Sequence, residues 1–114
     1  MTSPVNDVIK ALTTAFRKKF EDFQGIYLFG KFLDGKNHKD EDIEIVALFA
    51  TEDKSKREEI WPIVGKIETE FDVFIDLYPY TPEGFKEDED IYNEVMEEGI
   101  FFDALGIMKD KENE

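Results

Sequence analysis

The sequence has 114 residues, of which 41% are hydrophobic and 14% aromatic, which is enough for one small core but not for two. Its 28 acidic and 14 basic residues give a formal net charge of -14, which repels phosphate backbones and argues against nucleic acid as a partner. It contains no cysteine, which excludes disulfides, thiolate zinc sites and cysteine nucleophiles.

We therefore expect a single domain over residues 1–114, with a core at about 5–103 and a flexible acidic tail at 109–114. The N-terminal residues lack the basic-then-apolar pattern of a secretion signal, and no apolar run approaches the ~18 residues of a membrane span. The expectation is a cytoplasmic protein without a membrane partner.

The first third of the chain predicts a helix followed by a buried strand. The Ser-Pro pair at 3–4 reads as a helix cap and first helical residue, and apolar residues then recur at helical spacing to about Phe23. The Gln-Gly pair at 24–25 ends this helix. The apolar run at 26–29, closed by Gly30, predicts a buried strand that enters a tight turn.

The middle of the chain predicts a second strand, a helix and a third strand. Residues 42–49 alternate charged and apolar side chains before becoming wholly apolar, as in a strand whose outer end is exposed. Residues 51–53 form a plausible cap for the helix, which Pro62 either kinks or begins. Residues 72–80 predict the third strand.

The remaining segments are shorter. Residues 31–39 read as a loop or short helix, and a Thr-Pro-Glu start at 81–83 predicts one helix that runs to about Glu98. Residues 100–102 predict a short edge strand. The alternation of strands and helices indicates an α/β fold.

Two carboxylates and a glycine turn carry the chemistry. On a strand, Asp42 and Glu44 project to the same face, where two carboxylates can converge on one cation. Mg²⁺ prefers oxygen ligands, and two carboxylates plus substrate phosphates is the usual protein share. Gly30 lets the preceding strand turn sharply and brings backbone N–H groups close to a phosphate.

This spacing resembles a known signature. Leu28-Phe29-Gly30-Lys31, ten further residues and then Asp42-Ile43-Glu44 are similar to the Gly-Ser, ten residues, Asp-x-Asp signature of the DNA polymerase beta-like nucleotidyltransferase superfamily, particularly its minimal nucleotidyltransferase branch. The resemblance covers roughly residues 5–103. It implies the nucleotidyltransferase fold, which is a small mixed β-sheet flanked by helices.

The resemblance also implies residue roles. Members of the family carry three carboxylates that bind two metal ions, and these correspond to Asp42, Glu44 and Asp76. The ions are Mg²⁺, with Mn²⁺ as the alternative. Asp72, at the start of the predicted third strand, is the weaker candidate for the third ligand.

The nucleotide-binding turn implied by the resemblance consists of Phe29, Gly30 and Lys31. Two residues depart from the family pattern, because Lys31 stands where the family has Ser and Glu44 where it has Asp. The extra methylene of Glu44 displaces its carboxylate by about 1 Å, and misplacement on that scale can cost roughly 100-fold in rate. Lys31 either acts as a point charge on a phosphate or fills the space that Ser leaves open. Asp34 also stands where small members often carry Arg.

The motif and the resemblance together predict two alternative functions. The first is a metal-dependent nucleotidyltransferase (2.7.7.-) that moves a nucleoside monophosphate from a nucleoside triphosphate to a hydroxyl of a protein or small-molecule acceptor, with Asp76 helping to activate that hydroxyl. The second is a module with little or no turnover that binds a partner protein, as an antitoxin does. Small members of the family often work beside a separate helical protein, the toxin of a toxin–antitoxin pair, so we expect such a partner or a homodimer.

Each motif also has a purely structural interpretation. Asp42 and Glu44 read as a solvated strand face of an acidic chain, Gly30 as an ordinary turn residue, and Asp76 as an edge-strand acid that discourages aggregation. Their combination on three segments favours the fold interpretation more than it favours catalysis.

The remaining ionisable and aromatic side chains are assigned to the surface or to packing. His38 lies in a polar stretch and is expected on the surface. Trp61, Tyr78 and Tyr80 are expected in the core or at its rim, in preference to a platform that stacks on a nucleobase. Tyr78 shares the strand face of Asp76 and can line the cleft.

Overall fold

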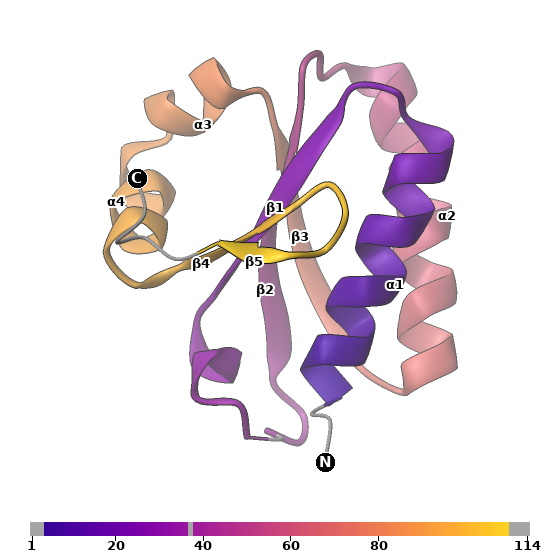
Figure 1. Ribbon diagram of the computed structural model, residues 1–114, viewed down its shortest axis with the longest axis vertical. Helices are drawn as coiled ribbons and strands as arrows, with labels where there is room; N and C mark the ends of the chain where they lie inside the picture. Colours follow the sequence, from indigo (N-terminus) through magenta and orange to yellow (C-terminus); the bar gives the residue numbers. More distant parts are fainter. Residues whose placement is uncertain (1–3, 37, 110–114) are drawn as a thin grey trace.

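The fold is built on one mixed five-stranded sheet with the strand order β3-β2-β1-β4-β5. The computed structural model describes residues 4–36 and 38–109. In chain order the elements are α1 (Pro4–Lys19), β1 (Phe23–Phe29), the 3-10 helix η1 (Lys31–Asp34), β2 (Asp42–Phe49), α2 (Lys54–Phe71), β3 (Phe74–Tyr80), α3 (Pro82–Glu87), α4 (Glu89–Glu98), β4 (Ile100–Asp103) and β5 (Met108–Lys109). Helices α1 and α2 cover one face of the sheet, and α3 and α4 cover the other (Figure 1). The expected mixed sheet flanked by helices is confirmed.

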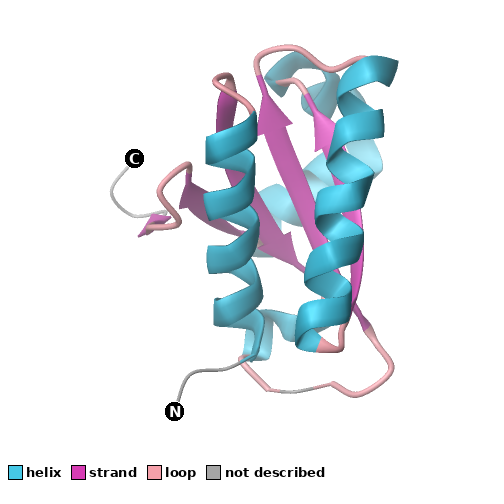
Figure 2. Cartoon of the chain, turned by 90° about the vertical axis from the view of Figure 1, so that its right-hand side faces the viewer, coloured by secondary structure: helices cyan, strands magenta, loops and turns pink. Residues whose placement is uncertain are grey.

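The larger core lies between the sheet and the helix pair α1 and α2, which stand side by side over it (Figure 2). Phe16 of α1 is fully buried and meets Phe49 of β2 edge to face, with ring centroids 5.7 Å apart. Offset or edge-to-face aromatic pairs of this kind stabilise a core beyond their buried area. Pro62 lies inside α2, so the alternative that it begins this helix is wrong.

The first helix is shorter than its apolar spacing predicts. It ends at Lys19, and Phe23 is already the first residue of β1. A bulge at the start of β1 shifts its register against β2, and Gly25 there has φ 143. Because the bulge places Phe23 and Ile26 on the same core, their three-residue spacing imitates a helix.

The chain after β3 also differs from the expectation of one helix. Thr81 caps α3 by accepting from the Gly84 N–H at 3.0 Å, as predicted, but the helix stops at Glu87. Asp88, with φ -87 and ψ 78, separates it from α4, and its carboxylate accepts a hydrogen bond from the Tyr80 hydroxyl. The predicted single helix is therefore two.

The predicted edge strand at 100–102 corresponds to β4 and is not at the edge, because β4 pairs with both β1 and β5. Lys109 belongs to β5 and not to a tail. The rest of the predicted tail, 110–114, and the predicted cap residue Ser3 lie outside the described residues.

The opposite edge of the sheet, β3, has protected backbone donors. The outward N–H of Ile75 donates to the Glu68 carboxylate of α2 at 2.8 Å. The nitrogen of Pro79, four residues further along β3, points to the same outer side of the sheet but carries no hydrogen. Both features reduce the capacity of this edge to pair with another strand.

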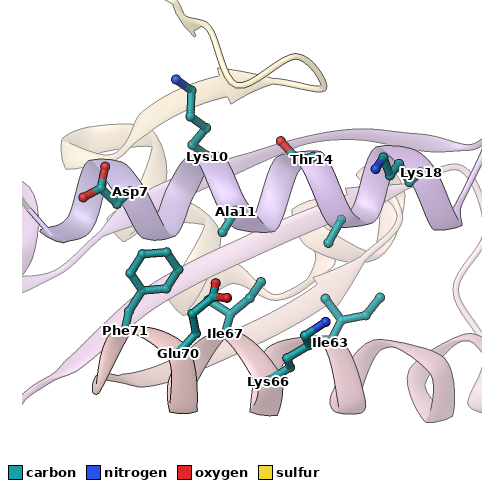
Figure 3. A pocket seen from close by; sticks show the side chains of 11 residues that line it. Asp7, Lys10, Ala11, Thr14, Lys18, Ile63, Lys66, Ile67, Glu70 and Phe71 are labelled. Atoms are coloured by element: carbon teal, nitrogen blue, oxygen red, sulfur yellow. The ribbon is translucent and has the colours of Figure 1, made fainter.

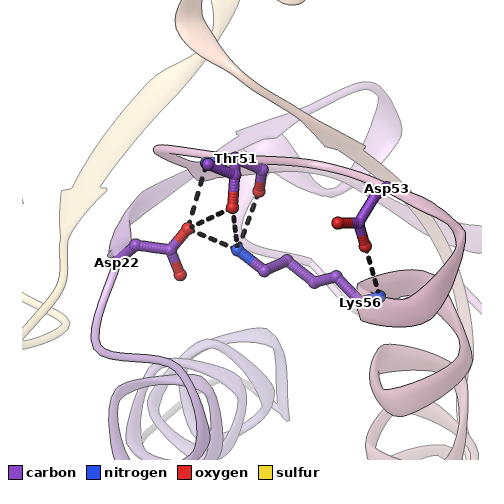
Figure 4. A network of polar contacts seen from close by, with 4 residues as sticks. All are labelled: Asp22, Thr51, Asp53 and Lys56. Atoms are coloured by element: carbon purple, nitrogen blue, oxygen red, sulfur yellow. Dashed lines mark hydrogen bonds and ion pairs between the residues drawn. The ribbon is translucent and has the colours of Figure 1, made fainter.

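A polar network ties the start of β1 to the end of β2 (Figure 4). The Lys56 ammonium donates to the carboxylate of Asp22 and to the backbone oxygen of Thr51, the latter at 2.7 Å, and Thr51 N–H donates to Asp22 at 3.0 Å. Asp53 caps α2 by accepting from Lys56 N–H at 2.8 Å, within the predicted 51–53 cap. Among the described residues, no helix combines the length and apolar character of a membrane span.

Candidate functional site

Three predicted carboxylates share one pocket at the end of the sheet opposite this network. Asp42 and Glu44 come from the start of β2, and Asp76 of β3 is the register partner of Glu44 in the parallel pair. Strand alternation places all three on the face covered by α3 and α4, where Val46 further along β2 is fully buried. The pocket has a volume of about 330 Å³, and Lys31, Asp40 and Glu41 complete its lining.

The pocket concentrates negative charge around Glu44. Partial burial raises the pKa of this carboxyl, and so do the charges of Glu94, Asp76, Asp42 and Glu41, in that order. Glu94 reaches the site from α4, so the helical layer adds to the charge of the strands. Such a group of carboxylates is electrostatically unfavourable by itself and is relieved by a cation.

The glycine turn lies directly beside the acids. Gly30 has φ 83 and ψ -153, a backbone conformation that side chains rarely adopt. A β-carbon at this position would lie 1.9 Å from Glu44 Oε2. Of the three residues of the predicted nucleotide-binding turn, Phe29 buries its side chain at 2% exposure, so its backbone alone can face a ligand.

Lys31, which replaces the family's Ser, is paired across the pocket mouth. Its ammonium lies 2.8 Å from Glu41 Oε1. The hydrogen bond and charge of Glu41 raise the pKa of Lys31, and the same contact lowers the pKa of Glu41. Both groups are exposed, so the pair can separate when a phosphate competes for the ammonium.

Tyr78 is held against Asp76. Its hydroxyl donates to Asp76 Oδ2 at 2.7 Å, and its ring lies 6.2 Å from that of Phe29. The hydrogen bond to Asp76, partial burial, and the charges of Asp76, Glu44 and Asp42 raise the pKa of Tyr78 to about 12. Tyr78 therefore shares the sheet face of Asp76, as its strand parity indicates, but it is not among the residues that line the pocket.

The other singled-out residues lie elsewhere. Asp72 is the left-handed C-cap of α2, with φ 53, and lines a separate hollow with Phe74, so it is not the third acid of this pocket. His38 contacts the Asp34 carboxylate at 2.8 Å and is half-buried. Trp61 is 46% exposed, so of the two expected places, the core and its rim, the core is wrong.

Sequence reasoning missed Asp40, Glu41 and Glu94. The acidic run that directly precedes β2 was the available indication for the first two, but it reads as an ordinary solvated loop. Nothing in the sequence places α4 over the start of β2.

The donor set suits a hard divalent cation, because all candidate ligands are carboxylate oxygens. Among the described residues, however, no three acid or histidine side chains are arranged so that they alone would hold a metal ion. A Mg²⁺ ion here would need further oxygens from water or from substrate phosphates, which is its usual coordination in phosphate-binding sites.

A larger hollow of about 590 Å³ lies between α1 and α2, on the other side of the sheet (Figure 3). Its floor is apolar, with Ala11 and Ile67, and its rim carries charges of both signs, including Lys10, Lys66 and Glu70. It has no group of converging carboxylates, so the smaller pocket is the candidate site for phosphate and metal chemistry.

A glycine turn facing acids on two parallel neighbouring strands of a mixed sheet defines the class of nucleotidyl-transfer folds. The chain belongs to the nucleotidyltransferase domain family, which matches residues 9–102. No curated protein matches the sequence.

Several solved structures that are similar to this chain are of toxin–antitoxin proteins. A double Asp-to-Glu mutant of the MntA–HepT toxin–antitoxin complex is 26% identical, with a TM-score of 0.60 over 82% of this chain and 70% of that one. A toxin–antitoxin structure with AMP-PNP is 23% identical, with a TM-score of 0.60 over 92% and 76% of the two chains. The complex of a tri-AMPylated HEPN toxin from Shewanella oneidensis with its MNT antitoxin is 22% identical, with a TM-score of 0.53 over 89% and 72%. At 23% and 22% identity, the last two similarities demonstrate the shared fold alone.

Proposed function

We propose that this nucleotidyltransferase domain is a metal-dependent enzyme that transfers a nucleoside monophosphate from a nucleoside triphosphate to a hydroxyl of a partner protein, acting in the cytoplasm as the antitoxin of a toxin–antitoxin pair. The observation that carries the proposal is the meeting of Asp42, Glu44 and Asp76 in one pocket beside the Gly30 turn. The structural similarity to a complex that contains an AMPylated toxin supports the choice of acceptor.

Asp42 and Glu44 are the residues that would hold Mg²⁺, with Asp76 as a third ligand. When bound, the cations would offset the charge of the triphosphate and of the attacking and leaving oxygens. The backbone at Gly30 and the ammonium of Lys31 would receive the phosphates.

Asp76 accepts the proton of the acceptor hydroxyl in this proposal. The hydroxyl oxygen forms a bond to the α-phosphorus, the bond from that phosphorus to the β-phosphate oxygen breaks, and pyrophosphate leaves. A positioned carboxylate base typically contributes about 10²–10⁴-fold to such a step.

The partner is a separate protein in this proposal, with a homodimer as the alternative. The formal net charge of -14 favours a basic surface around the acceptor hydroxyl, because opposite charges steer the two proteins together. Association should therefore weaken as ionic strength rises.

The first experiment measures thermal stability with ATP and the other triphosphates, each with and without Mg²⁺ or Mn²⁺. We expect the metal and nucleotide together to raise the melting temperature of the wild type but not of Asp42→Asn or Asp76→Asn. Asp72→Asn is the matched control, because it removes an acid outside the pocket and must retain the shift. No shift of the wild type at millimolar nucleotide would contradict the proposal.

The binding module without turnover is the second candidate. Two observations favour it: the Glu44 carboxylate lies against the Gly30 turn, and Lys31 is paired with Glu41 across the pocket mouth. The test is the double variant Glu44→Asp with Lys31→Ser. A large gain in nucleotide transfer over the wild type would identify the natural chain as a module that has lost turnover.

A further inference from the structure

The hydroxyl of Tyr78 is hydrogen-bonded to the carboxylate that is proposed as the general base. Its oxygen is 2.7 Å from Asp76 Oδ2, which is within the reach of a general base. Asp76 lines the same pocket as Glu44 and Asp42, so the hydroxyl is one hydrogen bond away from the group of carboxylates that would surround the reacting phosphate.

The ring of Tyr78 is held in place from the other side. It packs against the buried Phe29, with centroids 6.2 Å apart, directly before the Gly30 turn. The phenol therefore bridges the two parts of the site, the turn that would receive the phosphates and the acid that would accept a proton. A fixed geometry of this kind raises the effective concentration of a nucleophile.

Tyr80 provides an internal comparison. It lies two residues further along β3 and on the same strand face, but its hydroxyl donates to Asp88 between α3 and α4. One strand thus presents two half-buried tyrosines, of which one is directed at the candidate base and the other at a helix junction.

We propose that Tyr78 is a site of self-nucleotidylylation. This inference rests on the proposed function and adds an acceptor within the chain itself. The Tyr78 oxygen forms a bond to the α-phosphorus of a bound nucleoside triphosphate, the phenolic proton passes to Asp76, and the bond to the β-phosphate oxygen breaks as pyrophosphate leaves.

The product would limit its own formation. A nucleoside monophosphate attached to Tyr78 places a phosphodiester charge beside Asp76 and Glu44 and fills a pocket of about 330 Å³. Like charges in one site repel a second triphosphate. Each chain would therefore be modified once, and modified chains would no longer modify a partner.

The experiment incubates the purified full chain with ATP and MgCl₂, without a partner, and follows the protein by intact mass spectrometry. We expect one adenylyl group per chain. Tryptic cleavage after Lys66 and Lys86 yields a peptide that contains both Tyr78 and Tyr80, and fragmentation at Pro79 between them assigns the modified residue.

Three variants sharpen the assignment. Tyr80→Phe should keep the adduct, Tyr78→Phe should lose it, and Asp76→Asn should form it roughly 100-fold more slowly or worse. Melting curves of all variants establish that they are folded, and the assignment in the wild type does not depend on any of them.

The outcomes separate this inference from the proposed function. A chain that shows the metal-dependent shift with ATP but carries no adduct on Tyr78, or carries it equally on other tyrosines, overturns the inference and leaves the proposed function standing. A chain that shows neither the shift nor an adduct overturns both.

Discussion

The carboxylate of Glu44 occupies the space in front of Gly30: Oε2 lies 1.9 Å from the position that a β-carbon of residue 30 would take. The absence of a side chain at this turn therefore serves two purposes. It permits the positive φ of 83, and it lets the longer acid of β2 reach the turn.

Replacing Gly30 with alanine should separate these two purposes. We expect Gly30→Ala to destabilise the fold by about 1–2 kcal/mol through its backbone conformation and to displace the flexible Glu44 carboxylate. Gly35→Ala is the control, since Gly35 has φ 75 but open space around its Cβ position. Urea denaturation should show the larger loss for Gly30→Ala, because φ 83 with ψ -153 is a conformation that essentially only glycine adopts, whereas φ 75 with ψ 2 at Gly35 is left-handed helical. Only Gly30→Ala should lose the thermal shift with Mg²⁺ and ATP, and retention of that shift would show that Glu44 need not lie against the turn.

Neutralising Glu44 should stabilise the protein at neutral pH. Burial and neighbouring acids raise its folded pKa above the ordinary value of 4.5, so the folded state binds the proton more tightly than the unfolded state. Wild-type stability therefore falls as the pH rises from 4.5 through the folded pKa. Glu44→Gln should exceed the wild type in urea midpoint above that pKa and approach it below pH 4.5. A variant less stable than the wild type at about pH 7 contradicts this account.

The Lys56 network should contribute to stability without affecting the site. Lys56→Met removes the ammonium but keeps the apolar stem against Phe49, whose ring lies 5.0 Å below the nitrogen. Because the side chain is 11% exposed and bonds a carboxylate, we expect a loss of about 1–3 kcal/mol in urea denaturation. Lys19→Met breaks the exposed pair with Glu59 and should change stability by less than about 1 kcal/mol. Equal losses of stability in the two variants would show that the Lys56 network contributes no more than an exposed ion pair.

Asp22 should show the opposite pH dependence to Glu44. Burial tends to raise its pKa, but the bonds from Lys56 and Thr51 outweigh burial and hold the pKa below the ordinary value of 3.8. Its contribution is therefore fully present above pH 3.8 and is lost as the pH falls through the folded pKa. Asp22→Asn should be less stable than the wild type at about pH 6, and the gap should narrow on acidification. A gap independent of pH would mean that the charge of Asp22 is not what stabilises the fold.

The sequence was sufficient to predict that Asp42 and Glu44 lie on one face of their strand. Strand periodicity fixes the common face of Asp42 and Glu44, and the same parity brings Asp76 and Tyr78 to that face once β3 pairs in parallel with β2. These relations depend on local geometry, which a two-residue repeat encodes directly. The turn at Gly30 was also predictable locally, because a glycine that closes an apolar run indicates a tight turn.

The unpredicted features arise from tertiary contacts. Phe23 packs with the helix residue Phe16 at 5.4 Å between ring centroids, so a strand residue continued the helical pattern. The break at Asp88 accompanies a hydrogen bond from Tyr80, and the charge of Glu94 reaches Glu44 only because α4 folds over β2. The periodicity of the sequence alone does not reveal any of these contacts.

The protected backbone N–H groups of β3 affect the tendency of this protein to aggregate at high concentration. A chain with 11 phenylalanines would be prone to fibril growth if its outer strand offered a ready template to other copies. The hydrogen bond from the Ile75 N–H to Glu68, together with the missing N–H of Pro79, limits that template. A stable complex formed at this edge strand would then depend on side-chain contacts and not on extension of the sheet. Surface charge and shape would therefore select the partner protein.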